Sequence, residues 1–273
     1  MSTRPPSDLA GWVRHLEAAD IPVLHATVQE LALWREHEDA VDVRCLEEVI
    51  AADPLMTLKL LSHTAKAHGS RRQTDVETTR EALVLLGISP FFAALGTPTS
   101  VEDSLAARPD ALAGLREVLT RARRAGHFAL GFASHRLDPD AGLLYEAALL
   151  HDLAEMLLWC HAPDTALAVR AQLDADATLR SQTAQRAVLG TTLTEIQQVL
   201  MRRWHLPDVL VRATADADQA GPQERLVTLA VRLARHTAQG WGNAAIPDDV
   251  TAIAALLNLG EAPARRLLAE LDE

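Results

Sequence analysis

The segment that most constrains the fold is residues 147–159, Ala-Ala-Leu-Leu-His-Asp-Leu-Ala-Glu-Met-Leu-Leu-Trp, where apolar side chains dominate. A helix that is apolar on nearly all sides has to be buried in a core. We therefore expect a long central helix over about residues 142–160, which stops before Pro163. His151 and Asp152 form an adjacent polar pair inside this helix, and their role depends on which residues fold against them.

Apolar residues also recur at helical spacing along the rest of the chain. In residues 9–19, after the capping residues Ser7 and Asp8, they follow the i, i+3, i+4, i+7 pattern, and Asp53-Pro54 is a typical capped helix start. Further helices are expected at about residues 23–34, 55–67, 76–86, 110–135, 164–175, 178–189, 192–204, 207–217, 222–236, 248–258 and 262–271, with others beginning after Asp42 and at Ser89. No stretch alternates long enough to predict a strand, so the predicted fold is an all-α, multi-helix bundle.

Composition agrees with a helical globular protein and limits its partners. Hydrophobic residues make up 48% of the chain and aromatics 4%, and alanine and leucine favour helix. The net charge of −11 disfavours nucleic-acid binding, and we interpret the basic clusters Arg121, Arg123, Arg124 and Arg202, Arg203 as solvated helix faces. Residues 97–110, with two prolines, predict a seam between an N-terminal lobe, residues 1–100, and a helical bundle, residues 101–273, which together form one compact unit.

The cysteines and the N-terminus indicate the compartment. Cys45 and Cys160 have no C-x-x-C spacing, so we expect free thiols in a reducing environment. The N-terminus has no apolar signal region, and no run approaches the roughly 18 apolar residues of a membrane span. The expected protein is soluble and cytoplasmic, with no membrane partner.

Several stretches, in this order and spacing, resemble the HDOD family, the HD-related output domain of bacterial signalling proteins. They are residues 21–24 (Ile-Pro-Val-Leu), 46–54 (Leu-Glu-Glu-Val-Ile-Ala-Ala-Asp-Pro), 55–61 (Leu-Met-Thr-Leu-Lys-Leu-Leu), 81–87 (Glu-Ala-Leu-Val-Leu-Leu-Gly), 148–155 (Ala-Leu-Leu-His-Asp-Leu-Ala-Glu) and 204–207 (Trp-His-Leu-Pro). The resemblance implies an N-terminal helical lobe packed on an HD-like helical core, and a role in signal transduction. No receiver or cyclic-dinucleotide signature accompanies these stretches, so we expect a stand-alone or excised module.

The same resemblance indicates where a metal site would lie. An HD phosphohydrolase needs several His and Asp ligands from different helices to activate a water molecule. Many HDOD proteins carry an aromatic-x-His-Ser sequence before the His-Asp pair, a histidine before the Trp-x-Leu-Pro turn, and a His-His pair after it. The corresponding residues here are Arg121, Leu193, and Ala217 with Asp218, so the ligand pattern is degenerate.

A substitute set, His127, His151, Asp152 and Asp218, can still be drawn. However, His127 lies six residues after Arg121, which turns it about 120° around a helix. The favoured interpretation of His151 and Asp152 is a structural remnant of the HD pair, with hydrogen-bonded side chains and no metal or other cofactor. A divalent metal at this pair is the alternative.

Three functional hypotheses follow. The first is a non-catalytic regulatory module that acts by protein-protein contact, with a partner the sequence does not identify. The second is a metal-dependent phosphohydrolase, acting on a cyclic nucleotide or dinucleotide through His151 and Asp152. The third is a helical bundle that senses a small ligand near residues 97–110. Neither a phosphate-binding glycine loop nor a nucleophile elbow is present, and the adjacent Cys160 and His161 are weak evidence for catalysis.

Overall fold

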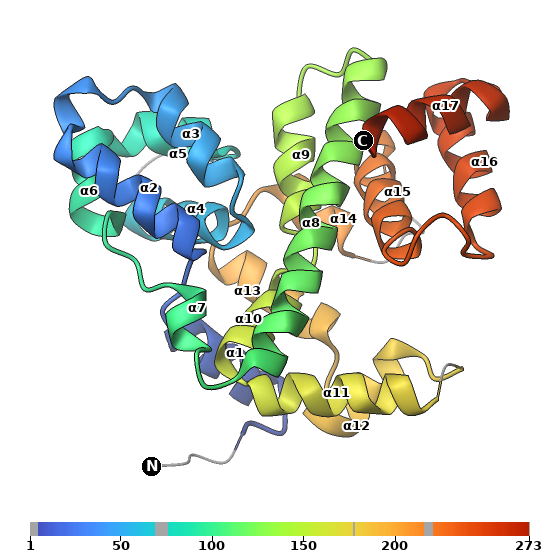
Figure 1. Ribbon diagram of the computed structural model, residues 1–273, viewed down its shortest axis with the longest axis horizontal. Coiled ribbons are helices and arrows are strands. Elements are labelled where there is room, and N and C mark those ends of the chain that lie inside the picture. Colours follow the sequence, from blue (N-terminus) through green and yellow to red (C-terminus); the bar gives the residue numbers. More distant parts are fainter. Residues whose placement is uncertain (1–4, 69–75, 177, 216–220, 273) are drawn as a thin grey trace. The chain divides into compact units, whose positions relative to one another are not determined.

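The computed structural model describes residues 5–68, 76–176, 178–215 and 221–272, and this part of the chain is all-α, as predicted (Figure 1). The helices are α1 (Leu9–Ala18), α2 (His25–Glu36), the 3-10 turn η1 (Glu38–Ala40), α3 (Val43–Ala51), α4 (Pro54–His68), α5 (Thr79–Leu86), α6 (Ile88–Leu95), α7 (Val101–Ser104), α8 (Pro109–His135), α9 (Ala141–Leu149), α10 (Leu153–His161), α11 (Pro163–Ala175), α12 (Ser181–Leu189), α13 (Leu193–Arg203), α14 (Asp208–Ala213), α15 (Pro222–His236), α16 (Ile246–Leu257) and α17 (Glu261–Leu271). Extended backbone pairing in the described chain is limited to a parallel bridge between Val23 and Ser100. None of the described helices is long and apolar enough to cross a membrane.

The prediction of one long helix over residues 142–160 is wrong. The chain forms two helices there, α9 and α10, separated by a turn at Leu150, His151 and Asp152. Neither proline nor glycine causes the break. Instead, the first-turn amide of Ala154 donates to Oε1 of Gln197 on α13, at 3.1 Å, so a tertiary contact fixes the new helix start.

Side-chain caps set other helix starts where the sequence predicts them. Asp8 accepts the amide of Gly11 at 2.7 Å and begins α1. Asp42 accepts the amide of Cys45 at 2.9 Å and begins α3. Because each cap satisfies a backbone N–H that lacks a partner inside its helix, these boundaries follow from local sequence.

Asp53 is a cap of a different kind. It is 1% exposed and begins α4 by accepting the amides of Leu55 and Met56, at 2.9 and 3.3 Å. Its other carboxylate oxygen accepts the amide of Leu24 and the hydroxyl of Thr27, both at 2.8 Å. One buried carboxylate therefore joins the start of α4 to the start of α2.

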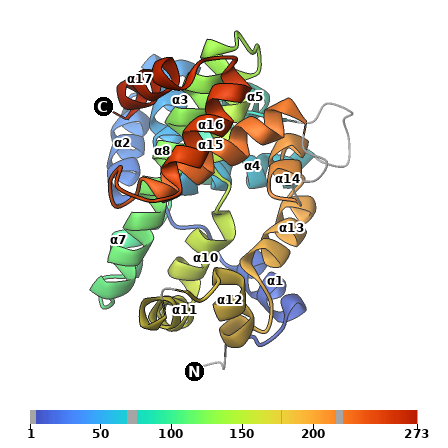
Figure 2. The same cartoon turned by 90° about the vertical axis from the view of Figure 1, so that its right-hand side faces the viewer.

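Contacts divide the chain into two compact units. The first contains the residues up to Val118 together with Asp152–Leu206, and residues 97–110 lie inside it. In this unit α3 packs on α4 and α5, α10 packs on α1, α4, α11 and α13, and α11 and α12 lie side by side (Figures 1 and 2). The buried indole of Trp12 donates to the carbonyl of Leu189 at 3.0 Å, which joins α1 to the end of α12. The division into residues 1–100 and 101–273 stays a prediction.

The second unit contains Leu119–His151 and the chain from Pro207 onward. Here α15 packs on α9, α14 and α16, and α17 packs on α16. Arg124 donates to Asp272 at 2.6 and 2.9 Å and to Thr237 at 2.8 Å, so the end of α17 is held to α8. The interpretation of this basic cluster as a solvated helix face is therefore wrong for Arg124, which binds other helices of its own unit.

Candidate functional site

The His-Asp pair lies in the turn between α9 and α10, and both residues are half-buried. The amide of His151 donates to the carbonyl of Ala148 at 3.3 Å and so closes α9. The carbonyl of Asp152 accepts the amides of Glu155 and Met156, at 3.0 and 3.2 Å, whereas its side chain does not cap α10. The backbone of the pair thus ends one helix and begins the next.

The other expected ligand positions differ in kind. Arg121 lies half-buried on α8, where its permanent positive charge opposes metal binding. Leu193 is the first residue of α13, and its amide donates to Oε1 of Gln185 at 3.0 Å. A leucine side chain offers no donor atom to a metal. Ala217 and Asp218 lie outside the described residues.

His127 is exposed on α8, and its ring stacks on Tyr145 of α9, with centroids 6.0 Å apart and planes at 30°. In the described part of the chain, no three His, Cys, Asp or Glu side chains gather closely enough to hold a metal ion. His127, His151 and Asp152 are therefore not brought together as a three-ligand group. A metal site that includes Asp218 stays a prediction, because Asp218 lies outside the described residues.

The adjacent pair Cys160 and His161 ends α10. Both cysteines of the chain are free thiols. Burial raises the pKa of the Cys160 thiol, and burial together with the nearby His15 lowers the pKa of His161 to about 4. At neutral pH the pair consists of a protonated thiol and a neutral imidazole, an arrangement that does not activate a nucleophile.

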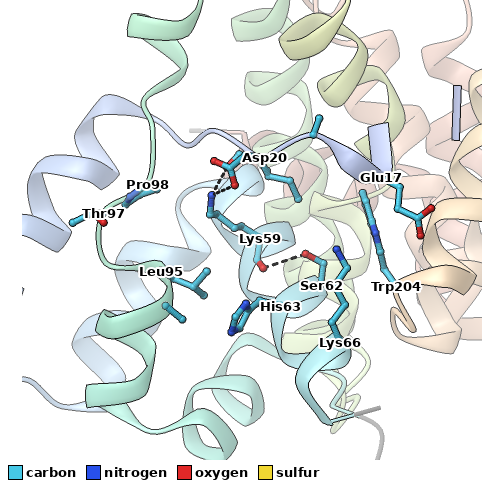
Figure 3. Close-up of a pocket in the computed structure, with 13 residues that line it drawn as sticks. Glu17, Asp20, Lys59, Ser62, His63, Lys66, Leu95, Thr97, Pro98 and Trp204 are labelled. Carbon is cyan, nitrogen blue, oxygen red and sulfur yellow. Dashed lines mark hydrogen bonds and ion pairs between the residues drawn. The ribbon is translucent and has the colours of Figure 1, made fainter. Parts of the chain in front are cut away.

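A cavity of about 340 Å³ lies within the first unit (Figure 3). Its wall is formed by the end of α1 and the segment after it, one face of α4, the end of α6, and Trp204 at the end of α13. The lining residues are Glu17, Ala19, Asp20, Ile21, Lys59, Ser62, His63, Lys66, Ala94, Leu95, Thr97, Pro98 and Trp204. Thr97 and Pro98 belong to the segment where the sequence predicts a seam.

Ion pairs fix two sides of this cavity. The ammonium of Lys59 donates to Oδ1 of Asp20 at 2.6 Å and to the carbonyl of Ile21 at 2.8 Å, as Figure 3 shows for Asp20. Glu17 pairs with Arg203 at 2.6 Å. Each carboxylate in the wall therefore has its own cation. Glu17 links α1 to Arg203 at the end of α13, and the segment that follows α1 is linked to α4.

Sequence reasoning missed this cavity, although α4 carries a signal for it. Lys59, Ser62, His63 and Lys66 interrupt an apolar helix at i, i+3, i+4 and i+7, which places four polar side chains on one face. Polar residues repeated at helical spacing on a core helix indicate either a solvated face or a wetted cavity. The sequence alone does not distinguish the two.

Comparisons with known proteins place this geometry in a family. The HDOD domain matches residues 21–220. The MmoQ response regulator from Methylococcus capsulatus has a solved structure similar to this chain, with a TM-score of 0.69, 22% identity, and coverage of 92% of this chain and 98% of that chain. A virulence factor from Campylobacter jejuni gives a TM-score of 0.64 at 20% identity, covering 97% of this chain and 92% of that chain. A comparison with curated proteins finds no match.

These structures share an HD-like, all-helical fold with the chain. An HDOD domain protein of unknown function from Geobacter sulfurreducens has the same architecture, with a TM-score of 0.50 at 14% identity and coverage of 97% and 99% of the two chains. The chain belongs to the HDOD family of signalling-type domains.

Proposed function

We propose that this HDOD protein is a non-catalytic regulatory module that transmits a signal through contact with a protein partner. The observation that carries this proposal is the identity of the residues at two expected ligand positions, Arg121 and Leu193. A guanidinium repels a metal ion and a leucine cannot bind one, so the two-residue remnant, His151 and Asp152, lacks the support that a hydrolytic site needs. Family membership supports the signalling role.

The remnant pair lies where one helix ends and the next begins. Backbone atoms of His151 and Asp152 make the bonds that end α9 and begin α10, and these bonds require no metal. In a catalytic HD site the same two side chains would have to converge with ligands from other helices. The competing proposal is a metal-dependent phosphohydrolase that uses this pair.

The test measures metal content and hydrolysis together. The protein is purified without chelators, its Mn, Fe and Zn are quantified, and hydrolysis of bis-p-nitrophenyl phosphate and of cyclic dinucleotides is assayed with each metal added. We expect no stoichiometric metal and no metal-dependent turnover. His135→Ala is the matched control for His151→Ala, because His135 is an exposed histidine in the same unit.

Metal-dependent turnover that disappears in His151→Ala and survives in His135→Ala would overturn the proposal in favour of the hydrolase. A second measurement concerns function in the cell. A deletion strain should regain its signalling output as fully with His151→Ala as with the wild type, provided that the variant accumulates to the same level. Failure of this rescue, together with metal-dependent turnover by the purified protein, contradicts a non-catalytic role.

A further inference from the structure

The lysines of this chain are placed unusually. Of the 26 lysine and arginine residues, 24 are arginines, and the two lysines are Lys59 and Lys66. Both lysines line the same cavity, although they make up a small minority of the basic residues. The chain thus uses arginine everywhere except at this one site.

The difference between the two side chains explains why lysine suits this position. A guanidinium is a broad planar fork that pairs with carboxylates in two-point contacts, whereas an ammonium is a compact point charge. The side chain of Lys59 is 12% exposed and lies along the wall, with its ammonium on Asp20 and Ile21. An arginine here would occupy more of the cavity, so lysine keeps the space open.

Lys66 is the cation that remains for a ligand. Its ammonium lies 5.7 Å from the centre of the Trp204 ring, a cation–π distance that holds the charge at the edge of the cavity. In the described chain, Glu17 pairs with Arg203 and Asp20 with Lys59, and no carboxylate lies within ion-pair distance of Lys66. Lys66 therefore contributes a positive charge that is not paired with a described carboxylate, on a protein whose net charge is −11.

Apolar side chains form another part of the wall. Ile21, Leu95 and Pro98 line the cavity beside the indole of Trp204. Trp204 is 1% exposed, and its Nε1–H has no acceptor among the described residues.

We propose that the cavity binds a small phosphate monoester with an apolar body, and that Lys66 holds its phosphate. A phosphate monoester carries about −1.5 to −2 charge at neutral pH, against −1 for a carboxylate, and it accepts donors from several directions, so a lysine attracts it more strongly. A volume of about 340 Å³ accommodates a ligand of one ring or a short chain. The site is independent of His151 and Asp152, so it can be tested whatever their role.

The first experiment uses phenyl phosphate as the probe, with isothermal titration calorimetry at constant ionic strength. We expect saturable one-to-one binding, weakened about tenfold or more in Lys66→Gln, which removes the charge, keeps a polar end group and slightly shortens the side chain. Arg180→Gln makes the same charge change at an exposed position of the same unit, outside the cavity, and should bind as the wild type does. Circular dichroism confirms that both variants are folded.

The second experiment exploits the scarcity of lysine. Reductive methylation with ¹³C-formaldehyde labels Lys59, Lys66 and the α-amino group while preserving their charges, and Lys66→Arg assigns the signals. During a titration with phenyl phosphate, the NMR signal of Lys66 should shift, and the dissociation constant from this shift should equal the one from calorimetry. The proposal is overturned if millimolar phenyl phosphate gives no saturable binding, if Lys66→Gln binds unchanged, or if the Lys66 signal does not move. Equal binding of benzoate overturns the phosphate assignment, and equal binding of inorganic phosphate overturns the role of the apolar wall.

Discussion

Replacing Asp53 with alanine is expected to lower the free energy of unfolding by about 3 kcal/mol. Loss of a helix cap alone is worth about 1 kcal/mol, which covers the amides of Leu55 and Met56. The substitution also leaves the Leu24 amide and the Thr27 hydroxyl without their acceptor in a buried region, at about 1 to 2 kcal/mol each. Burial raises the pKa of Asp53, which shows that its buried charge has a desolvation cost. The alanine variant no longer has that cost, so the expected loss of unfolding free energy is at the lower end of the range.

Asp42→Ala is the matched control, because Asp42 also caps a helix but is exposed and accepts the amide of Cys45 at 2.9 Å. Asp42→Ala is expected to lower the free energy of unfolding by about 1 kcal/mol. Urea unfolding followed by circular dichroism at pH 7 compares both variants with the wild type, with unchanged m-values as the check that the same transition is measured. If Asp53→Ala loses no more stability than Asp42→Ala, the bridging role of Asp53 is refuted.

Two further predictions concern packing and pH. A Cβ on Gly114 would lie 2.5 Å from the ring of Trp159, whereas a Cβ on Gly142 meets nothing within 4 Å. In urea unfolding, Gly114→Ala should therefore lower the free energy of unfolding by about 1 to 3 kcal/mol, and Gly142→Ala should raise it by up to about 1 kcal/mol. Equal effects would contradict the close packing of α8 on Trp159. The pKa of His161 falls from 6.5 to about 4 in the folded protein, so between these values the unfolded chain binds more protons and acidification favours unfolding. When the pH is lowered from 6.5 to 4, the free energy of unfolding of His161→Asn should fall by about 2 kcal/mol less than that of the wild type. If the free energies of unfolding of the two proteins change in parallel with pH, the effect is excluded.

Most of the fold could be predicted because its determinants are local. Asp8 and Asp42 begin helices where the sequence places a cap, and the long α8 follows the predicted range closely. The break between α9 and α10 could not be predicted in this way, since it depends on Gln197, which is distant in sequence. Helical periodicity detects an apolar segment but not an interruption made by a tertiary hydrogen bond.

The candidate sites differ in the same respect. The His-Asp pair is visible in sequence because its two residues are adjacent, and the family pattern indicates which positions should support it. The cavity is assembled from four separate segments, ending with Trp204, so no single stretch describes it. Its signal in the sequence is the placement of Lys59 and Lys66 on one face of α4, which becomes informative once the wall is known.

The turn at His151 and Asp152 has a consequence for how the chain folds during synthesis. Asp152–Leu206 completes a compact unit whose other part ends at Val118, with the intervening residues assigned to the second unit. Neither unit is a continuous piece of chain, so a cut at residue 118, 151 or 206 yields no fragment that contains one whole unit and nothing else. The first unit cannot close until its late segment has left the ribosome, and closing so long a loop favours slow, late formation of its core.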